Sequence, residues 1–211
     1  MAAQEGFAGL HASQPRMSEA TSTVLAMTRA IYNTATSLDG FLADAENSLS
    51  WLFAVPPEGT DEALAAFTAN IGVYVEGSTT YEWLLAETRM LDHPEKWSEF
   101  YGDRPTFVFT SRDLPRPAGA DVRFVHGAVA THLKQIRAAA GERDVWVVGG
   151  GDLAGQFADA GALDEIRLSV APASLGAGAP VLPRRLGADR LALVSAQRTG
   201  AFAELVFAVT S

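Results

Sequence analysis

The sequence predicts an α/β fold in which a mostly parallel central sheet is flanked by helices and ends in an antiparallel C-terminal edge. β-prone runs alternate with helical patterns through most of the chain, which favours parallel strands joined by helical crossovers. Residues 145–148 are almost continuously apolar, as is typical of a strand covered on both faces. No helical pattern separates residues 191–194 from residues 202–209, so these last two strands should pair as an antiparallel edge.

The N-terminal half of the predicted domain begins with a strand at residues 31–36, and Asp39-Gly40 is a turn signal directly after it. Thr60 is placed to cap a helix that begins at Asp61, whose apolar residues are spaced for one face. A strand is expected at residues 71–77 because this segment is largely apolar and ends in glycine. A second helix should follow it at once.

The C-terminal half continues the alternation. Residues 106–110 and 122–125 are expected to be strands, and residues 129–140 carry apolar side chains at the spacing of an amphipathic helix. Gly149-Gly150-Gly151 lies between the apolar run and the next helical pattern. Residues 166–170 form one further strand before the antiparallel pair.

Composition excludes several classes of protein. Hydrophobic residues make up 48% of the 211 residues, which is enough for a sizeable core and excludes global disorder. The formal net charge of -9 repels phosphate backbones, so no nucleic-acid partner is expected. The chain has no cysteine and only four scattered histidines, so we expect neither thiol chemistry nor a metal site. No apolar run reaches the roughly 20 residues of a membrane span. We therefore expect no membrane partner, and the lack of cysteine fits a cytoplasmic location.

Residues 1–28 differ from the rest of the chain. They are rich in Ala, Ser, Thr, Gln and Gly, show no sustained periodicity and contain no continuous apolar stretch like that of a signal peptide. We expect them to be a disordered leader, followed by one domain at residues 29–211.

The strongest chemical signal is the glycine run at residues 149–151, where a buried strand leads directly into a helix. Without a Cβ atom, glycine lets a diphosphate approach the backbone, and the helix N-terminus favours an anion. A tight strand-to-helix turn explains the same glycines about equally well.

Two other predicted strands end in residues that can bind phosphate. Gly77 is followed by hydroxyl side chains that either bind phosphate or simply cap a helix. Thr110-Ser111-Arg112 either holds a phosphate group or forms a solvated turn. Taken alone, the residues after Gly77 are better explained as a helix cap, and residues 110–112 as a solvated turn. Three such ends at one edge of an α/β sheet together indicate a nucleotide lying across the strands.

Five motifs occur in a characteristic order: Ser37-Leu38-Asp39-Gly40-Phe41-Leu42-Ala43, Gly77-x-x-Thr80-Tyr81-Glu82, Thr110-Ser111-Arg112, Val148-Gly149-Gly150-Gly151, and Val170-Ala171-Pro172 before Leu175-Gly176. Together they resemble the dihydrofolate reductase-like superfamily. Within it, the resemblance is closest to the C-terminal reductase domain of the riboflavin-biosynthesis bifunctional deaminase-reductase, over about residues 28–210. It implies a three-layer dihydrofolate reductase-like fold, NADPH as cofactor and a homodimer. It also implies reduction of a small-molecule heterocycle, either of pterin or pyrimidine type or a ribosylaminopyrimidine. The alternative function is a non-catalytic dinucleotide-binding protein.

The resemblance also assigns roles to individual residues. It places Asn47, Leu49 and Trp51 in a mobile loop that closes over the nicotinamide ring, with Trp51 at the substrate. The positions that it assigns to the cofactor are Thr34, Ala35, Leu42, Gly77, Ser78, Thr80, Thr110, Ser111, Arg112, Gly149, Gly150, Gly151, Leu153 and Ala154.

Ser78 is a departure from the family pattern. The family commonly carries Arg or Lys directly after the glycine at position 77, where it contacts the 2′-phosphate of NADPH. Arg112 is a candidate to replace this cation, because a guanidinium binds phosphate with two parallel hydrogen bonds. NADPH therefore remains the expected cofactor.

The catalytic carboxylate has two candidates. Asp61 stands where dihydrofolate reductases keep their substrate carboxylate, although an acidic residue there also compensates a helix dipole. Asp39 is the rival candidate and is also an ordinary turn former. Ser169 matches a strand position that faces the substrate pocket. Trp83, Trp97 and Trp146 are expected in the core or an interface.

Overall fold

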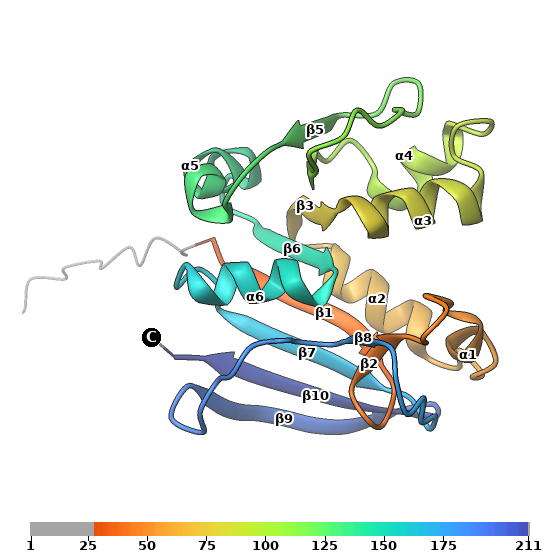
Figure 1. Ribbon diagram of the computed structural model, residues 1–211, viewed down its shortest axis with the longest axis vertical. Coiled ribbons are helices and arrows are strands. Elements are labelled where there is room, and N and C mark those ends of the chain that lie inside the picture. The colour runs from red at the N-terminus through yellow and green to blue at the C-terminus, as the bar shows by residue number, and fades with distance from the viewer. Residues whose placement is uncertain (1–27, 211) are drawn as a thin grey trace, which may run out of the picture.

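The structure is a computed structural model that describes residues 28–210 (Figure 1). The predicted disordered leader at residues 1–28 lies outside the described residues, except for Thr28. The strands are β1 (Ala30–Thr36), β2 (Phe41–Ala43), β3 (Ile71–Gly77), β4 (Thr106–Phe109), β5 (Val122–Val125), β6 (Asp144–Gly149), β7 (Glu165–Val170), β8 (Ala179–Pro180), β9 (Leu191–Thr199) and β10 (Phe202–Val209). The helices are α1 (Ser50–Phe53), α2 (Thr60–Thr68), α3 (Ser78–Thr88), α4 (Glu95–Tyr101), α5 (Val129–Ala140) and α6 (Gly151–Asp159).

The main sheet has the strand order β5-β4-β3-β6-β1-β7-β10-β9. In this order, the first six strands, from β5 to β7, are parallel to their neighbours. Strand β10 is antiparallel to both β7 and β9. The predicted parallel sheet and its antiparallel C-terminal edge are therefore confirmed. A second sheet pairs β2 with β8. It was not predicted, because segments of two or three residues are too short to show a period.

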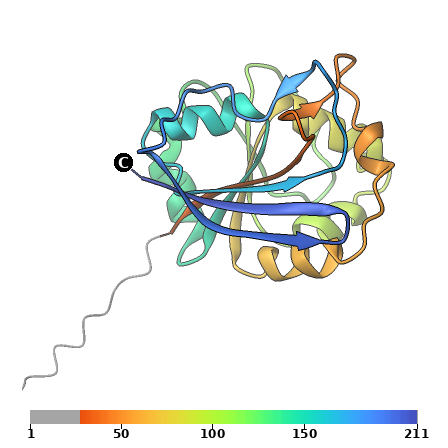
Figure 2. The same cartoon turned by 90° about the horizontal axis from the view of Figure 1, so that it is seen from below.

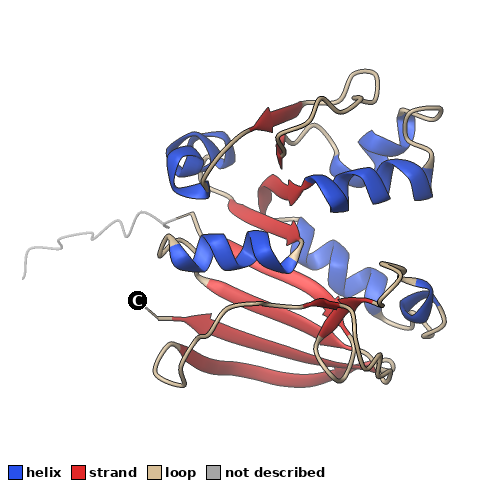
Figure 3. Ribbon diagram, viewed as in Figure 1, coloured by secondary structure: helices blue, strands red, loops and turns tan. Residues whose placement is uncertain are grey.

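Helices cover both faces of the sheet. Figure 2 shows α6 and α2 on opposite sides of it, and Figure 3 shows how the helices frame the strands. Alternate residues of β3 enter different cores: Val73 and Val75 join the cluster under α5 and α6, whereas Tyr74 joins the cluster under α3 and α4. Residues 28–210 include no helix that is long and apolar enough to cross a membrane.

Two local predictions need correction. Thr60 is not the cap of α2, because Gly59 occupies that position with a φ of 77° and the Thr60 hydroxyl instead donates to the Pro57 carbonyl at 2.6 Å. Helix α4 was not expected at all. Its Trp97 and Tyr101 are buried, but only two inward-facing residues in seven leave a weak periodic signal.

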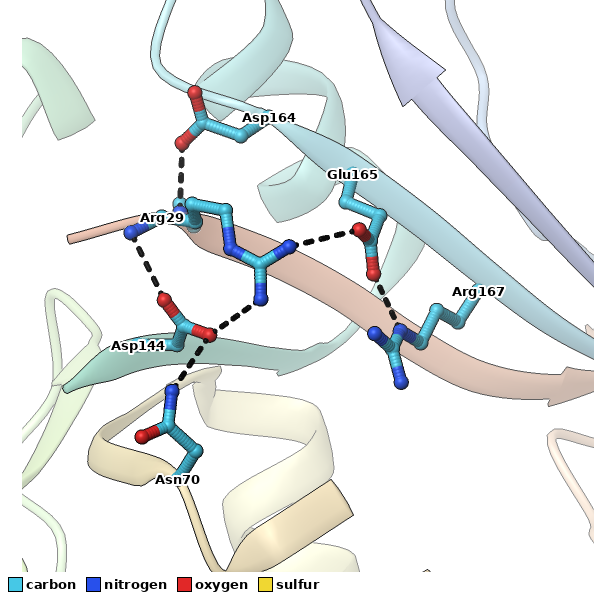
Figure 4. Close-up of polar contacts among 7 residues, drawn as sticks. Arg29, Asn70, Asp144, Asp164, Glu165 and Arg167 are labelled. Atoms are coloured by element: carbon cyan, nitrogen blue, oxygen red, sulfur yellow. Dashed lines mark hydrogen bonds and ion pairs between the residues drawn. The ribbon is translucent and has the colours of Figure 1, made fainter. Parts of the chain in front are cut away.

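An ion-pair network joins the amino ends of β1, β6 and β7 (Figure 4). The Arg29 guanidinium contacts Asp144 at 2.7 Å and Glu165 at 3.1 Å, and Glu165 also binds Arg167. The Asn70 side chain donates to Asp144 at 3.1 Å. Burial raises the pKa of Asp144, but the hydrogen bonds from Arg29 and Asn70 outweigh it and hold the pKa below its usual value.

Asp144→Asn is expected to lower the free energy of unfolding by about 1–3 kcal/mol at neutral pH, because charge-assisted hydrogen bonds are lost. The folded pKa is lowered, so this contribution is present above the unfolded pKa and disappears as the pH falls through the folded pKa. Urea unfolding at neutral and strongly acidic pH should show that the difference shrinks in acid. Asp92→Asn, which removes an exposed pair with Arg89, is the control and should cost less than about 1 kcal/mol. Equal effects of the two variants would contradict this prediction.

Candidate functional site

A cavity of about 500 Å³ lies at the carboxyl ends of β1 and β6. Segments far apart in the sequence form its walls, including β1, β2 with the loop after it, α3, α4 and β8. Within the described part of the chain, the lining residues are Thr34, Ala35, Leu42, Ala43, Asn47, Leu49, Leu52, Thr79, Thr80, Trp83, Leu84, Phe100, Trp146, Val148, Gly149, Gly150, Gly151, Asp152, Ala179, Pro180 and Pro183.

The glycine turn forms one end of the cavity. The peptide bond between Gly149 and Gly150 is cis. A Cβ atom on Gly151 would lie 2.4 Å from the Pro180 carbonyl oxygen and 2.5 Å from that of Val181. Glycine is thus the residue that lets the start of α6 approach the strand β8, which pairs with β2 to form a wall of the site.

Two helix N-termini meet at this end. Helix α3 follows Gly77 at the end of β3, and α6 follows Gly150 after β6, the neighbouring parallel strand. Neither helix has a side-chain cap hydrogen bond. A Cβ atom on Gly77 would lie 3.8 Å from the Gly149 oxygen and the Gly150 nitrogen, so the two turns are in contact. The first-turn N–H groups and dipoles of both helices therefore face one small region, which suits an anion.

A third strand end lies next to this pair, because β4 adjoins β3. The Thr110 hydroxyl accepts a hydrogen bond from the Arg112 N–H at 2.9 Å, which closes a turn. The two terminal guanidinium nitrogens of Arg112 donate to the Glu82 carboxylate on α3. Thr110, Ser111 and Arg112 thus lie beside the two helix N-termini along one sheet edge, but they do not line the cavity.

Aromatic side chains form another part of the lining. Trp83 stacks on Phe53, with ring centroids 6.1 Å apart and an interplanar angle of 11°. The Trp146 indole donates to the Asn33 carbonyl at 2.9 Å, which fixes the ring in place. Trp97 and Trp146 are buried in the core as expected, and Trp83 packs against the same core. Trp83 and Trp146 also line the cavity.

The loop after β2 brings Asn47 and Leu49 to the cavity, and α1 adds Leu52. The Asp44 carboxylate shapes this loop by accepting the Ser48 N–H at 2.7 Å. Trp51 does not line the cavity, contrary to its predicted place at the substrate. Leu49 and Leu52 are three residues apart and therefore lie on the same face of the turn of α1, whereas Trp51, next to Leu52, lies on another face.

The predicted cofactor positions fall into four groups, one of which is the turn of Thr110, Ser111 and Arg112 described above. Those that line the cavity are Thr34, Ala35, Leu42, Thr80, Gly149, Gly150 and Gly151. Gly77 and Ser78 lie at the start of α3 beside it, whereas Leu153 and Ala154 are on the buried face of α6, in the core.

The structure does not bring the predicted carboxylates to the cavity. The Asp39 carboxylate accepts hydrogen bonds from the Ser37 hydroxyl at 2.6 Å and from the Gly176 N–H at 2.7 Å. These bonds, the one from Ser37 first, lower the pKa of Asp39, so it is ionised and cannot donate a proton at neutral pH. Asp61 is exposed in the first turn of α2, where it compensates the helix dipole.

Ser169 is also outside the lining. Its hydroxyl donates to Glu204 at 2.8 Å, which links β7 to β10 across the antiparallel edge. The position that was predicted to face a substrate therefore contributes a cross-strand hydrogen bond.

Several lining residues were missed by the sequence analysis, among them Phe100, Asp152 and Pro180, whereas Thr79 is one of the hydroxyl residues expected after Gly77. Asp152 directly follows the glycine run. Its carboxylate accepts hydrogen bonds from Gln156 and Arg184, both at 2.9 Å, and these lower its pKa. No sequence signal marked Phe100, because it reaches the site through the packing of α4.

Comparison with known proteins agrees with this fold. The family model described as the RibD C-terminal domain matches residues 29–203. An uncharacterised Bacillus subtilis (strain 168) protein, YwjB, is 27% identical over 172 residues, which cover 81% of this chain and 92% of that protein. A structure described as a riboflavin biosynthesis protein of Shewanella sp. PV-4 matches with a TM-score of 0.70 at 22% identity, covering 87% of this chain and 100% of that one.

A bifunctional protein of Thermotoga maritima has the same fold. It is described as a diaminohydroxyphosphoribosylaminopyrimidine deaminase and 5-amino-6-(5-phosphoribosylamino)uracil reductase. The match has a TM-score of 0.64 at 15% identity and covers 87% of this chain but 57% of that one. These matches confirm the fold and the family resemblance expected from the sequence.

Proposed function

Because the chain belongs to the family of the RibD C-terminal domain, we propose that it is a reductase that uses NADPH to reduce a nitrogen heterocycle of pterin or pyrimidine type. The observation that supports this most is the meeting of two uncapped helix N-termini, those of α3 and α6, at neighbouring strand ends. Such an arrangement suits the diphosphate of a dinucleotide. The adjoining cavity of about 500 Å³ is large enough for planar rings.

The lining residues fit the parts of such a cofactor. The backbone at Gly149, Gly150 and Gly151 would hold the diphosphate, and Thr34 with Ala35 would orient the nicotinamide. When bound, NADPH supplies a hydride to the carbon of a C=N bond, whose nitrogen then takes a proton. Asp152 is an acidic lining residue, but its lowered pKa keeps it ionised at neutral pH. The proton is therefore expected to come from water.

Binding of NADPH is the first test. A dinucleotide at 100 times its dissociation constant should stabilise the protein by about 2.7 kcal/mol, or roughly 5–10 °C in the melting temperature of a domain of this size. NADH at equal concentration measures how much the 2′-phosphate contributes to binding, because Arg112, the candidate partner of that phosphate, is paired with Glu82. The absence of any shift at millimolar NADPH would overturn the proposal.

Gly77→Ala is the matched variant for this test. Its Cβ atom would make ordinary contacts at 3.8 Å, so the melting temperature without cofactor should change little. Since the added methyl group lies between the two helix N-termini, we expect NADPH affinity to fall at least tenfold. Unchanged affinity would show that the diphosphate binds elsewhere.

A non-catalytic dinucleotide-binding protein is the alternative. It would show the same stabilisation without turnover. Loss of NADPH absorbance in the presence of a panel of pterins and aminopyrimidines separates the two, since consumption with any acceptor supports the reductase.

We also propose a homodimer. Strand β9 is one of the two edge strands of the main sheet, and β5 is the other (Figure 1). Leu193 and Val194 of β9 are 60% and 62% exposed, and an apolar edge strand of this kind favours association. Light scattering should return about twice the chain mass of 22.3 kDa, and the mass of a single chain would contradict the proposal.

A further inference from the structure

The cavity wall away from the glycine turn is apolar. Trp83 lies five residues after Ser78, roughly 7.5 Å further along α3 at about 1.5 Å per residue. Phe100 and Leu52 reach the same cavity from α4 and α1. Phe100 is 40% exposed, and Phe53, which stacks on Trp83, is 64% exposed. Large aromatic surfaces therefore remain open to solvent at this site, and a flat ring would cover them.

The charges at the site are negative or already paired. Among the lining residues that the structure describes, Asp152 carries the one charged side chain, a carboxylate. Arg184 is next to the rim, but its guanidinium binds Asp152 at 2.9 Å and Asp159 at 2.7 Å. Arg112, on the neighbouring strand end, is paired with Glu82. A phosphate on the acceptor would have to break one of these pairs or lie unpaired against apolar side chains, which is costly.

Under the proposed function, the diphosphate of the dinucleotide occupies the phosphate-binding positions at the N-termini of α3 and α6. The two helix N-termini face one small region, and the dinucleotide diphosphate would fill it. An acceptor ring stacked near Trp83 and Phe100 is then left with aromatic surfaces and the hydroxyl and amide groups of residues such as Thr79 and Asn47.

We infer that the acceptor is an uncharged, planar nitrogen heterocycle that carries no phosphate. The site takes the free base or the nucleoside rather than the nucleoside 5′-phosphate. This inference rests on the proposed function, and it separates this chain from the phosphoribosyl compound that the description of the Thermotoga maritima protein names.

The test uses two ligands that differ by one phosphate group. The full chain, saturated with NADP⁺, is titrated with 5-amino-6-(5-phosphoribosylamino)uracil and with the same compound after phosphatase treatment. We expect the dephosphorylated ligand to bind at least tenfold more tightly, as followed by quenching of tryptophan fluorescence. Equal binding of the two, or tighter binding of the phosphorylated form, overturns the inference.

Phe100→Arg adds a cation at the cavity. It should raise the affinity for the phosphorylated ligand at least tenfold. It should lower the affinity for the dephosphorylated ligand, because the aromatic ring at position 100 is lost. Leu91→Arg, at a position that is 47% exposed and outside the lining, is the matched control and should change neither. If Phe100→Arg does not fold, Asp152→Asn replaces it in the test. Asp152→Asn should reduce the difference in affinity between the phosphorylated and dephosphorylated ligands. If neither Phe100→Arg nor Asp152→Asn raises the affinity for the phosphorylated ligand, charge does not exclude the phosphate and the inference is wrong.

The two proposals fail in different ways. No stabilisation by NADPH removes the proposed function, and the inference with it. Stabilisation by NADPH together with preferred binding of the phosphorylated ligand removes the inference alone.

Discussion

Replacing Gly151 by alanine is expected to lower the free energy of unfolding by about 2–3 kcal/mol, the upper part of the usual cost of overpacking. The new Cβ atom would lie 2.4 Å from the Pro180 oxygen, 2.5 Å from the Val181 oxygen and 2.9 Å from the Val181 carbonyl carbon. These are backbone atoms, so they cannot rotate away as the end of a long side chain can. The start of α6 and the segment after β8 must therefore move apart.

This movement should affect binding as well as stability. Pro180 and Gly151 both line the cavity, and β8 pairs with β2, so a displaced β8 changes a wall of the site. We expect the melting temperature of Gly151→Ala to fall by roughly 5–10 °C and NADPH binding to weaken. Gly77→Ala is the control for stability, because its Cβ atom meets nothing closer than 3.8 Å. Similar melting temperatures for the two variants would show that α6 does not need a glycine there.

Glu76→Gln is expected to stabilise the protein at alkaline pH. Glu76 is fully buried on β3, where the Tyr101 hydroxyl donates to its Oε1 at 3.0 Å. Within residues 28–210, its Oε2 has no hydrogen-bond partner. Burial raises the pKa of Glu76 to about 8, against a smaller lowering by the Tyr101 bond. The side chain is therefore mostly a neutral acid at neutral pH.

The sign of the pH dependence follows from this raised pKa. Between the unfolded pKa near 4.5 and the folded pKa near 8, the folded state holds a proton that the unfolded state has lost. Stability then falls as the pH rises through this range, by at most about 1.4 kcal/mol per pH unit. Glutamine keeps an acceptor for the Tyr101 hydroxyl and does not titrate, so the stability of the variant should not fall over this pH range. Above pH 8, its free energy of unfolding should exceed that of the wild type by a few kcal/mol.

Urea unfolding at pH 5, 7 and 9 measures the effect. Glu99→Gln, an exposed position on α4, is the control and should follow the wild type at every pH. Parallel curves for the wild type and Glu76→Gln would show that the carboxyl group is not a buried acid in solution.

Much of the fold could be predicted because its signals are local. The apolar run at residues 145–148 became the central part of β6, and the glycines after it begin α6. The strand ends with Gly77 and Thr110 lie along one edge as expected, since the carboxyl ends of parallel strands meet there. Helix α1 and strand β8 have too few residues to show a period, so they were not foreseen.

The candidate site was predicted less completely. The glycines and Thr80 could be placed because turns and helix starts depend on neighbouring residues. Trp51 and Leu52 are adjacent, yet Leu52 alone of the two lines the cavity, because the orientation of α1 selects one face. Asp39 was a reasonable acid until its partners in the loop at residues 174–176 were visible.

The residues alone were therefore sufficient for the strands of the main sheet, the antiparallel pairing of its C-terminal edge and the glycine turn, since each depends on backbone preferences over a few neighbours. They did not predict α1, α4, β2 or β8. Chain packing was needed to select Phe100, Trp83 and Pro180 for the cavity and to leave Asp61 in solvent. Burial and ion pairing depend on groups far apart in the sequence, so the chemical character of the site emerges only when those groups are in contact.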